Sequence, residues 1–324
     1  MQSQSLALDY LAPVMELLRA ADVTEVMING ADKVFVKRYG SKKHRVDIKI
    51  SDQEISSAIT NLASISFREV GVGNATGHKI ISAQLPGYRI EAWLSPVAVM
   101  GSCLTIRKLG SSVFTLDQLV GRGLLTEAVA AYLTNAVLEE KNIFLAGGTG
   151  SGKTTLANSL LAVIPDDQRM IVIETIHELN LRQENVVYFE ADSEQGVSVR
   201  RLIKSAMRGF PDRIIVGEVR GEEAYDLIYA AKSGHPGTVA TLHADDAQSI
   251  LEKLEDMCIE GQPSLPLISH RKRIASAAHV LGFMSEVTTA KGNELRLCEL
   301  REVIGLDADG NYATKLIFGY EPDA

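Results

Sequence analysis

The pattern of hydrophobic and polar positions divides the chain into two parts. Up to about residue 108, short strand-like runs lie on either side of a helical stretch, which is typical of a small α+β domain. From residue 126 onward, helices alternate with short apolar strands. Because parallel strands need crossover connections, this alternation predicts a mainly parallel sheet covered by helices, and therefore an α/β fold.

The N-terminal domain, 1–108, is predicted from one capped helix and its flanking strands. Ser51 and Glu54 form a capping box, which predicts the start of a helix within SDQEISSAITNLASI. Strand-like runs precede and follow it: TEVMING, KVFVKRY, RVDIKI, YRIEAWLSPV and GSCLTIRKL.

A further helix is predicted over residues 5–20, where Pro13 either weakens the prediction or lies in a first turn. The apolar residues of one face are Leu11, Met15 and Leu18. This face could touch a membrane surface, but Arg19 is its only basic residue, so we expect it to pack on its own domain.

The second domain is predicted over 126–324. A polar connector at about 109–125, within GSSVFTLDQLVGRGLLT, precedes it and contains glycines. The first elements of the domain alternate as the α/β pattern requires. They are helix 126–140, strand 143–146, helix 153–162, strand 170–174 and strand 213–217.

The run IFLAGGTGSGKTTLANSL, residues 143–160, is a strand, a glycine loop and a helix in the order of a P-loop. Its glycines let backbone N–H groups turn toward phosphate oxygens, at the positive end of a helix. Lys153 is expected to reach the β- and γ-phosphates, and the Thr154 hydroxyl to hold Mg²⁺. The predicted nucleotide-binding residues are Gly147, Gly148, Thr149, Gly150, Ser151, Gly152, Lys153, Thr154 and Thr155.

Acidic residues follow two later apolar strands. RMIVIETIHELNL supplies Glu174 and Glu178, and PDRIIVGEVRG supplies Glu218. Ligands of parallel sheets gather at the carboxyl ends of strands, so these carboxylates are predicted beside the P-loop, although surface glutamates are the alternative. Gly217 stands where many P-loop proteins carry an aspartate, so Glu218 is expected to reach Mg²⁺ only through a water.

The segment SGHPGTVATLHADD carries two histidines and two threonines around a glycine-rich turn and a strand. A lone histidine is usually structural, and a role for His235 stays open. A histidine or threonine here could instead donate a hydrogen bond to a γ-phosphate and report its loss. The candidates are His235, Thr238, Thr241 and His243.

Composition and charge limit the classes of protein to which this chain can belong. The chain has 324 residues, 46% hydrophobic and 23% charged, with a net charge of −8. This charge gives no overall basic footprint for nucleic acid. The three cysteines are far apart and indicate neither a zinc site nor a disulfide framework, which fits a reducing cytoplasm. The sequence shows no secretory signal and no apolar run long enough to span a membrane.

Together, four segments resemble the type II/type IV secretion ATPase family, the traffic ATPases. GGTGSGKTTL resembles its Walker A motif, IETIHEL its acidic box, PDRIIVGEVRG its Walker B motif, and SGHPGTVATLHA its histidine box. The resemblance implies a RecA-like ATPase domain and hydrolysis of ATP with Mg²⁺. It also implies Glu178 as the water-activating residue, with Glu174 nearby, and a role for His243.

The resemblance further implies hexameric rings, in which the N-terminal domain sends arginines to the phosphates. By position these are Arg89 in GYRIEAW and Arg107 in LTIRKL; the alternative is two surface arginines on strands. In MRGFPDR, Arg208 matches the family, but Phe210 stands where a second basic residue is frequent. A ring contact there is therefore in question.

Within this family, the short N-terminal domain and RKRIASAAHVLGFMSE are most similar to the conjugation and type IV secretion branch. This branch implies a peripheral ATPase at the cytoplasmic face of a bacterial inner membrane, with partners in the secretion apparatus. Pilus retraction is the alternative within the family. Outside it, the alternatives are a small-molecule kinase, a DNA-pumping motor using HRKR, 270–273, and a nucleotide switch that does not hydrolyse.

Overall fold

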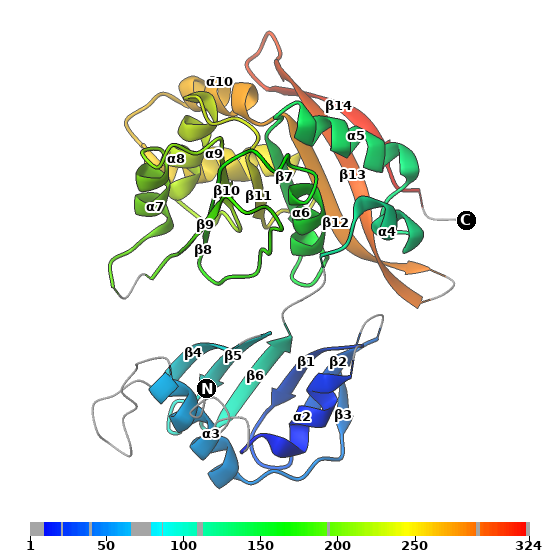
Figure 1. Ribbon diagram of the computed structural model, residues 1–324, viewed down its shortest axis with the longest axis vertical. Coiled ribbons are helices and arrows are strands. Elements are labelled where there is room, and N and C mark those ends of the chain that lie inside the picture. Colours follow the sequence, from blue (N-terminus) through cyan, green and yellow to red (C-terminus); the bar gives the residue numbers. More distant parts are fainter. Residues whose placement is uncertain are drawn as a thin grey trace. The chain divides into compact units, whose positions relative to one another are not determined.

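The computed structural model describes residues 10–20, 22–38, 41–65, 79–85, 87–108, 113–192, 195–289 and 292–321. The chain forms two compact units, Met1–Ser111 and Ser112–Ala324. Figure 1 shows a sheet with its own helices in each unit, and each unit is described here by itself.

Among its described residues, the first unit has a six-stranded antiparallel sheet in the order β3-β2-β1-β6-β5-β4. Its strands are β1 (Val23–Ile28), β2 (Val34–Arg38), β3 (His44–Val46), β4 (Ile80–Leu85), β5 (Tyr88–Trp93) and β6 (Cys103–Lys108). Alternate residues of β1, β5 and β6 are buried in one core with the helices, so the other face of the sheet carries their polar residues.

Two described helices, α2 (Ala12–Arg19) and α3 (Asp52–Ile65), supply the rest of this core. The capping box of α3 is confirmed, because Ser51 N donates to Glu54 Oε2 at 2.7 Å and Glu54 N donates to Ser51 Oγ at 3.2 Å. Helix α2 has Pro13 in its first turn, and Leu18 in the helix and Leu11 at its N-cap are both buried. The first residues of the predicted helix 5–20 lie outside the described residues.

The second unit has, in its described part, an eight-stranded sheet in the order β14-β13-β12-β7-β11-β10-β8-β9. The pairings from β12 to β9 are parallel, and those of β13 and β14 are antiparallel. The strands are β7 (Ile143–Gly147), β8 (Met170–Glu174), β9 (Val186–Glu190), β10 (Arg213–Val216), β11 (Val239–Leu242), β12 (Val280–Thr289), β13 (Gly292–Leu306) and β14 (Tyr312–Gly319). The predicted α/β class with a mainly parallel sheet is confirmed.

Helices cover both faces of this sheet, over two separate cores. One core holds the helices α7 (Val199–Ala206), α8 (Glu223–Lys232), α9 (Ser249–Gly261) and α10 (Leu267–Ala277). The other holds α4 (Leu116–Gly121), α5 (Glu127–Leu138) and α6 (Lys153–Leu161). Strands β7, β8, β10 and β11 are buried throughout, which explains why they are continuous apolar runs in the sequence.

The sequence prediction did not include several elements of the second unit, among them helices α7 to α10 and strand β9. The expected connector, 109–125, contains helix α4, whose Thr115 forms a capping box with Gln118 and whose Leu116 and Leu119 are buried in the second unit's core. Strands β12 to β14 were not predicted, because half-buried and exposed residues interrupt their apolar pattern. Among the described residues, no helix is long and apolar enough to cross a membrane.

Candidate active site

The P-loop joins the buried strand β7 to helix α6. Gly152 stands at the N-cap of α6 with φ 94°, a left-handed conformation that favours glycine. Lys153 follows it and is only 9% exposed. Its Nζ donates to the carbonyl oxygens of Gly147 at 2.6 Å and Gly148 at 2.8 Å. The ammonium thus lies inside the loop that the sequence predicts for phosphates.

Glu178 reaches the P-loop from the segment after β8. The Thr154 hydroxyl donates to Glu178 Oε2 at 3.3 Å, and the Glu178 side chain is partly buried. Asn158, one turn further along α6, accepts from Asn180 N at 2.8 Å and donates to Glu178 O at 3.4 Å. Helix α6 therefore holds this segment against the loop.

Glu174 ends β8 and points into the protein. It is 6% exposed. Its Oε1 accepts from the backbone N–H groups of Glu178 and Leu179, both at 3.1 Å, and its Oε2 lies 3.3 Å from His177 Nδ1. Burial raises the pKa of Glu174 to about 8, although the two backbone donors oppose the rise.

Glu218 follows β10 and is held by two basic residues. Arg220 Nη2 lies 2.5 Å from Glu218 Oε2, and His243 Nε2 lies 3.0 Å from Glu218 Oε1. Burial would raise the pKa of Glu218, but the hydrogen bond and charge of Arg220, with His243 and Lys153 nearby, keep it below its usual value. Glu218 is therefore a carboxylate at neutral pH.

The strand register brings these side chains to one edge of the sheet. Leu242 pairs with Ala146, Val216 with Ala240, and Val216 with Ile173. Because β7, β11, β10 and β8 are adjacent and parallel, their carboxyl ends meet at the P-loop. The three glutamates and His243 thus lie at the edge of the sheet that carries the P-loop.

The histidine segment is divided between opposite ends of β11. Thr241 lies near the P-loop end and donates to Gly217 O at 2.7 Å. Thr238 and His235 precede the strand, where Thr238 donates to Ile214 O and His235 Nδ1 lies 3.1 Å from Pro211 O. His235 and Thr238 therefore lie at the end of β11 opposite the P-loop, whereas His243 lies at the P-loop end.

In the first unit, Arg89 and Arg107 lie side by side on the polar face of the sheet. They pair directly across β5 and β6, and Arg107 also pairs with Glu25 across β1. Residues directly opposite in an antiparallel pair point to the same face. Arg107 Nε and Nη2 both lie 2.7 Å from Glu25 Oε1.

Three residues beside the predicted ones were missed from the sequence. Arg220 and His177 stand inside the quoted acidic segments, two residues after Glu218 and three after Glu174. Only the strand pairing of β1 and β6 brings Glu25 to Arg107, so no local sequence pattern indicated this contact of Glu25.

Phe210, which stands where a second basic residue is frequent, is 92% exposed and has φ 56°. It precedes β10, at the end of the sheet opposite the P-loop.

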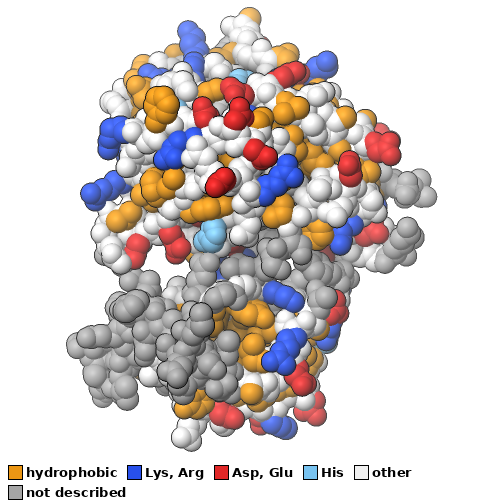
Figure 2. Space-filling view, in the orientation of Figure 1, with side chains coloured by type: hydrophobic (Ala, Val, Ile, Leu, Met, Phe, Trp, Pro, Cys, Tyr) orange, Lys and Arg blue, Asp and Glu red, His pale blue; other side chains and the backbone are white. Residues whose placement is uncertain are grey.

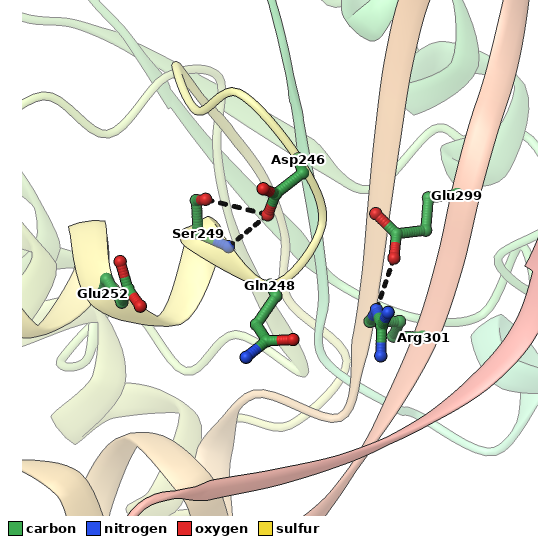
Figure 3. Close-up of a pocket in the computed structure, with 6 residues that line it drawn as sticks. All are labelled: Asp246, Gln248, Ser249, Glu252, Glu299 and Arg301. Atoms are coloured by element: carbon green, nitrogen blue, oxygen red, sulfur yellow. Dashed lines mark hydrogen bonds and ion pairs between the residues drawn. The ribbon is translucent and has the colours of Figure 1, made fainter.

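A pocket of about 260 Å³ lies between the start of α9 and β13 (Figure 3). Its lining residues are Asp246, Gln248, Ser249, Glu252, Glu299 and Arg301. Asp246 caps α9 through Ser249, and Glu299 is paired with Arg301. Because carboxylates dominate the lining, phosphate would be repelled here, and the P-loop remains the predicted nucleotide site.

Known proteins resemble this chain in sequence and in fold. Residues 7–284 match the model of the family described as "Type II/IV secretion system protein". This match spans more than half of the chain, and the chain belongs to this family. The family expected from the four motifs is thereby confirmed.

Its relatives include proteins of conjugation and type IV secretion. The conjugal transfer protein TrbB of Rhizobium radiobacter is 38% identical over 252 residues, 76% of this chain and 75% of that protein. The type IV secretion system protein VirB11 of Bartonella henselae is 32% identical over 300 residues, 81% and 83% of the two chains. The crystal structure of the VirB11 ATPase of Brucella suis with sulphate has 27% identity and a TM-score of 0.50, covering 93% and 95%.

Proposed function

We propose that this chain hydrolyses ATP to power the assembly of a bacterial type IV secretion or conjugation apparatus, or transfer through it. The contact between Thr154 Oγ1 and Glu178 Oε2 at 3.3 Å carries this proposal. It places a carboxylate, the usual group for orienting or deprotonating water, beside the residue that holds Mg²⁺ in P-loop proteins. The names of the relatives supply the biological process.

Binding of ATP would use the loop Gly147 to Thr155. Backbone N–H groups and the N-terminus of α6 would bind phosphate oxygens. Lys153 would exchange its contacts with the carbonyl oxygens of Gly147 and Gly148 for the β- and γ-phosphates. The phosphate oxygens are charged acceptors, whereas the carbonyl oxygens are neutral. Hydrogen bonds from the Lys153 ammonium to phosphate are therefore stronger, and the exchange favours the nucleotide complex.

The residues fit Mg²⁺, because the Thr154 hydroxyl and the nearby carboxylates are the oxygen ligands that this ion prefers. Thr154 would hold the ion, and Glu218 would reach it through a water. When bound, Mg²⁺ neutralises charge developing on the β- and γ-phosphates.

Hydrolysis would proceed with Glu178 orienting the water and accepting its proton. His243 would donate a hydrogen bond to the γ-phosphate, while its Nε2 lies 3.0 Å from Glu218 Oε1. Loss of the γ-phosphate would remove that partner, so the pair Glu218–His243 would report hydrolysis to the rest of the unit. Glu174 would act near Glu178 without touching ATP.

Arg89 and Arg107 would supply further charge to the phosphates from the first unit. Two cations that face each other across β5 and β6 repel, and an anionic ligand relieves this repulsion. Glu25 balances one of them in the free protein.

We infer that the protein works as a homo-hexameric ring at the cytoplasmic face of the inner membrane, where partners in the secretion apparatus dock. Membrane contact would be peripheral. The relatives' names favour conjugation and type IV secretion over pilus retraction, the alternative within the family.

A DNA-pumping motor is supported less well. In the basic cluster 270–273, His270 is 1% exposed and Arg271 is paired with Glu255 at 2.7 Å. Arg273 donates to the Tyr225 hydroxyl. Figure 2 shows acidic and basic side chains interspersed on the visible face of the second unit. Such a mixed face does not favour binding of the phosphate backbone of a nucleic acid.

Phosphate release from ATP tests the proposal, with Lys153→Ala as the diagnostic variant. Removing the cation should abolish hydrolysis and weaken nucleotide binding, while Lys272→Ala, an exposed lysine outside the site, should match the unaltered protein. Near-normal turnover in Lys153→Ala would overturn the P-loop assignment. Phosphate transfer to a small molecule, without release, would indicate a kinase, and tight binding without turnover would indicate a switch.

A further inference from the structure

Gly217 has no side chain, and the side chain of Glu174, at the end of β8, occupies the space beside it. Gly217 follows β10 directly, and its neighbour Val216 pairs with Ile173 of β8. A Cβ atom on Gly217 would lie 2.8 Å from Glu174 Cγ and 3.0 Å from Glu174 Oε1. Gly217 is not among the glycines with positive φ, so any residue could adopt its backbone conformation. Glycine is required here because the Glu174 side chain lies across it.

Glu174 in turn shapes the segment that carries Glu178. Its Oε1 accepts from two successive backbone N–H groups, those of Glu178 and Leu179. Leu179 is buried in the core beneath α6, and Asn158 holds Asn180 from the other side. The backbone of Glu178 is thus fixed on both sides, and its carboxylate lies against Thr154.

We propose that Glu174 is a positioning residue, which occupies the space over Gly217 and folds the segment 175–179 so that Glu178 meets the P-loop threonine. This inference rests on the proposed function, in which Glu178 acts on the attacking water. It assigns the carboxyl group of Glu174 neither to the metal nor to the proton transfer.

The surroundings of Glu174 agree with this role. Both oxygens already have protein partners, and the side chain is almost fully buried. The raised pKa, about 8, indicates that the acid form is populated at neutral pH. In that form Oε1 still accepts from the two backbone N–H groups, and Oε2–H can donate to His177 Nδ1 at 3.3 Å. Glutamine offers the same acceptor and donor at the same places.

Steady-state kinetics of Glu174→Ala and Glu174→Gln test the inference. Glu174→Ala should lower kcat by about 10²-fold, within the range of lost acid–base catalysis, because Glu178 is released from its place. KM for ATP should change by less than about three-fold, since the P-loop is intact. Glu174→Gln should restore kcat at least about ten-fold over Glu174→Ala. Equal kcat for the two variants would overturn the inference, because a chemical role needs the carboxylate.

Gly217→Ala provides an independent test through a double-mutant cycle. Alone, its methyl group should push Glu174 aside and lower kcat by about the same factor as Glu174→Ala. In the Glu174→Ala background the space is vacant, so the added methyl should cost less than about two-fold. Losses that multiply fully would show that the two residues act separately and would contradict the proposal.

Amide hydrogen exchange of the full chain tests the same inference without any turnover. The backbone N–H groups of Glu178 and Leu179 should exchange at least about ten-fold faster in Glu174→Ala, and at the original rate in Glu174→Gln. Unchanged exchange in Glu174→Ala would refute the positioning role, even in a protein that proved unable to hydrolyse ATP. Conversely, faster exchange with no ATP hydrolysis by the unaltered protein would support the positioning and refute the proposed function.

Discussion

At the scale of residues, three glutamates at the ends of neighbouring strands have different surroundings and therefore different chemistry. Glu174 is buried and has a pKa raised to about 8, whereas Glu218 is held as a carboxylate by Arg220 and His243. Glu178 is partly exposed and contacts Thr154. These surroundings support the proposal that Glu178, rather than Glu174 or Glu218, acts on the attacking water.

Glu178→Gln should leave ATP binding intact and lower kcat by about 10²–10⁴-fold, because the amide keeps the shape and loses the base. Binding of a fluorescent ATP analogue and phosphate release would be measured on the same preparation. Glu184→Gln, in the loop before β9, is the matched control. A severe loss in Glu218→Gln with normal turnover in Glu178→Gln would transfer the role of base to Glu218.

The pH dependence of stability should reflect the buried Glu174. Its pKa is about 8 in the folded protein against 4.5 for the free group, so the folded state holds the proton more tightly. Its stabilising contribution is fully present below pH 4.5 and is lost as the pH rises toward 8. Relative to Glu174→Gln, the free energy of unfolding should fall over this range by at most about 1.4 kcal/mol per pH unit, measured by urea denaturation. A constant difference would show that Glu174 is ionised throughout.

At the scale of elements, the antiparallel sheet of the first unit sets the spacing of its charges. Register places Glu25, Arg107 and Arg89 in one row across β1, β6 and β5, on the face away from the helices. The row continues to Lys37 of β2, which pairs with Glu25, so it holds three cations and one anion. This excess of positive charge supports the proposal that the phosphates of ATP bind to these arginines.

Arg107→Ala and Arg89→Ala should each lower ATP turnover, although both belong to the first unit. An arginine that stabilises a transferring phosphoryl group is worth about 10³–10⁵-fold in kcat in other systems. Arg38→Ala removes an arginine of the same sheet that is paired with Asp22 at 2.7 Å, and it should leave kcat unaltered. Equal effects of all three substitutions would point to folding of the sheet rather than to the phosphates.

At the scale of the whole molecule, the family and the open P-loop both favour an assembly of identical chains. A nucleotide bound at the end of a sheet leaves part of its surface exposed, and a neighbouring copy can cover it. Head-to-tail contacts between identical copies close into rings when the rotation permits. A nucleotide held by such contacts tightens the arrangement that it contacts best.

The protein should therefore form a ring of about six copies, closing by rotation as head-to-tail assemblies do. Light scattering with and without a non-hydrolysable ATP analogue would measure its mass, with Lys153→Ala as the control that cannot respond to nucleotide. A monomer in both conditions, with full ATPase activity, would show that the chemistry needs no ring. It would also remove the physical reason for regarding the chain as a motor.

The sequence alone determined the features that depend on neighbouring residues. The P-loop is one continuous strand, loop and helix, and the capping box joins Ser51 to Glu54, three residues later. Each could therefore be predicted from neighbouring residues alone. Strands β8, β10 and β11 were legible because full burial requires apolar runs. The capping box of helix α4 at Thr115 is also a local pattern, but the glycines that follow the helix led to the prediction of a connector there.

Only the tertiary structure decided which side chains meet. Strand β11 carries His243 to the P-loop and leaves His235 at the other end, although one short segment holds both. The pairing of β1 with β6 brings Glu25 to Arg107, and the pairing of β8 with β10 lays Glu174 over Gly217. These contacts join residues far apart in the chain, and strand register and burial fix them. No local pattern of residue types encodes such a register by itself.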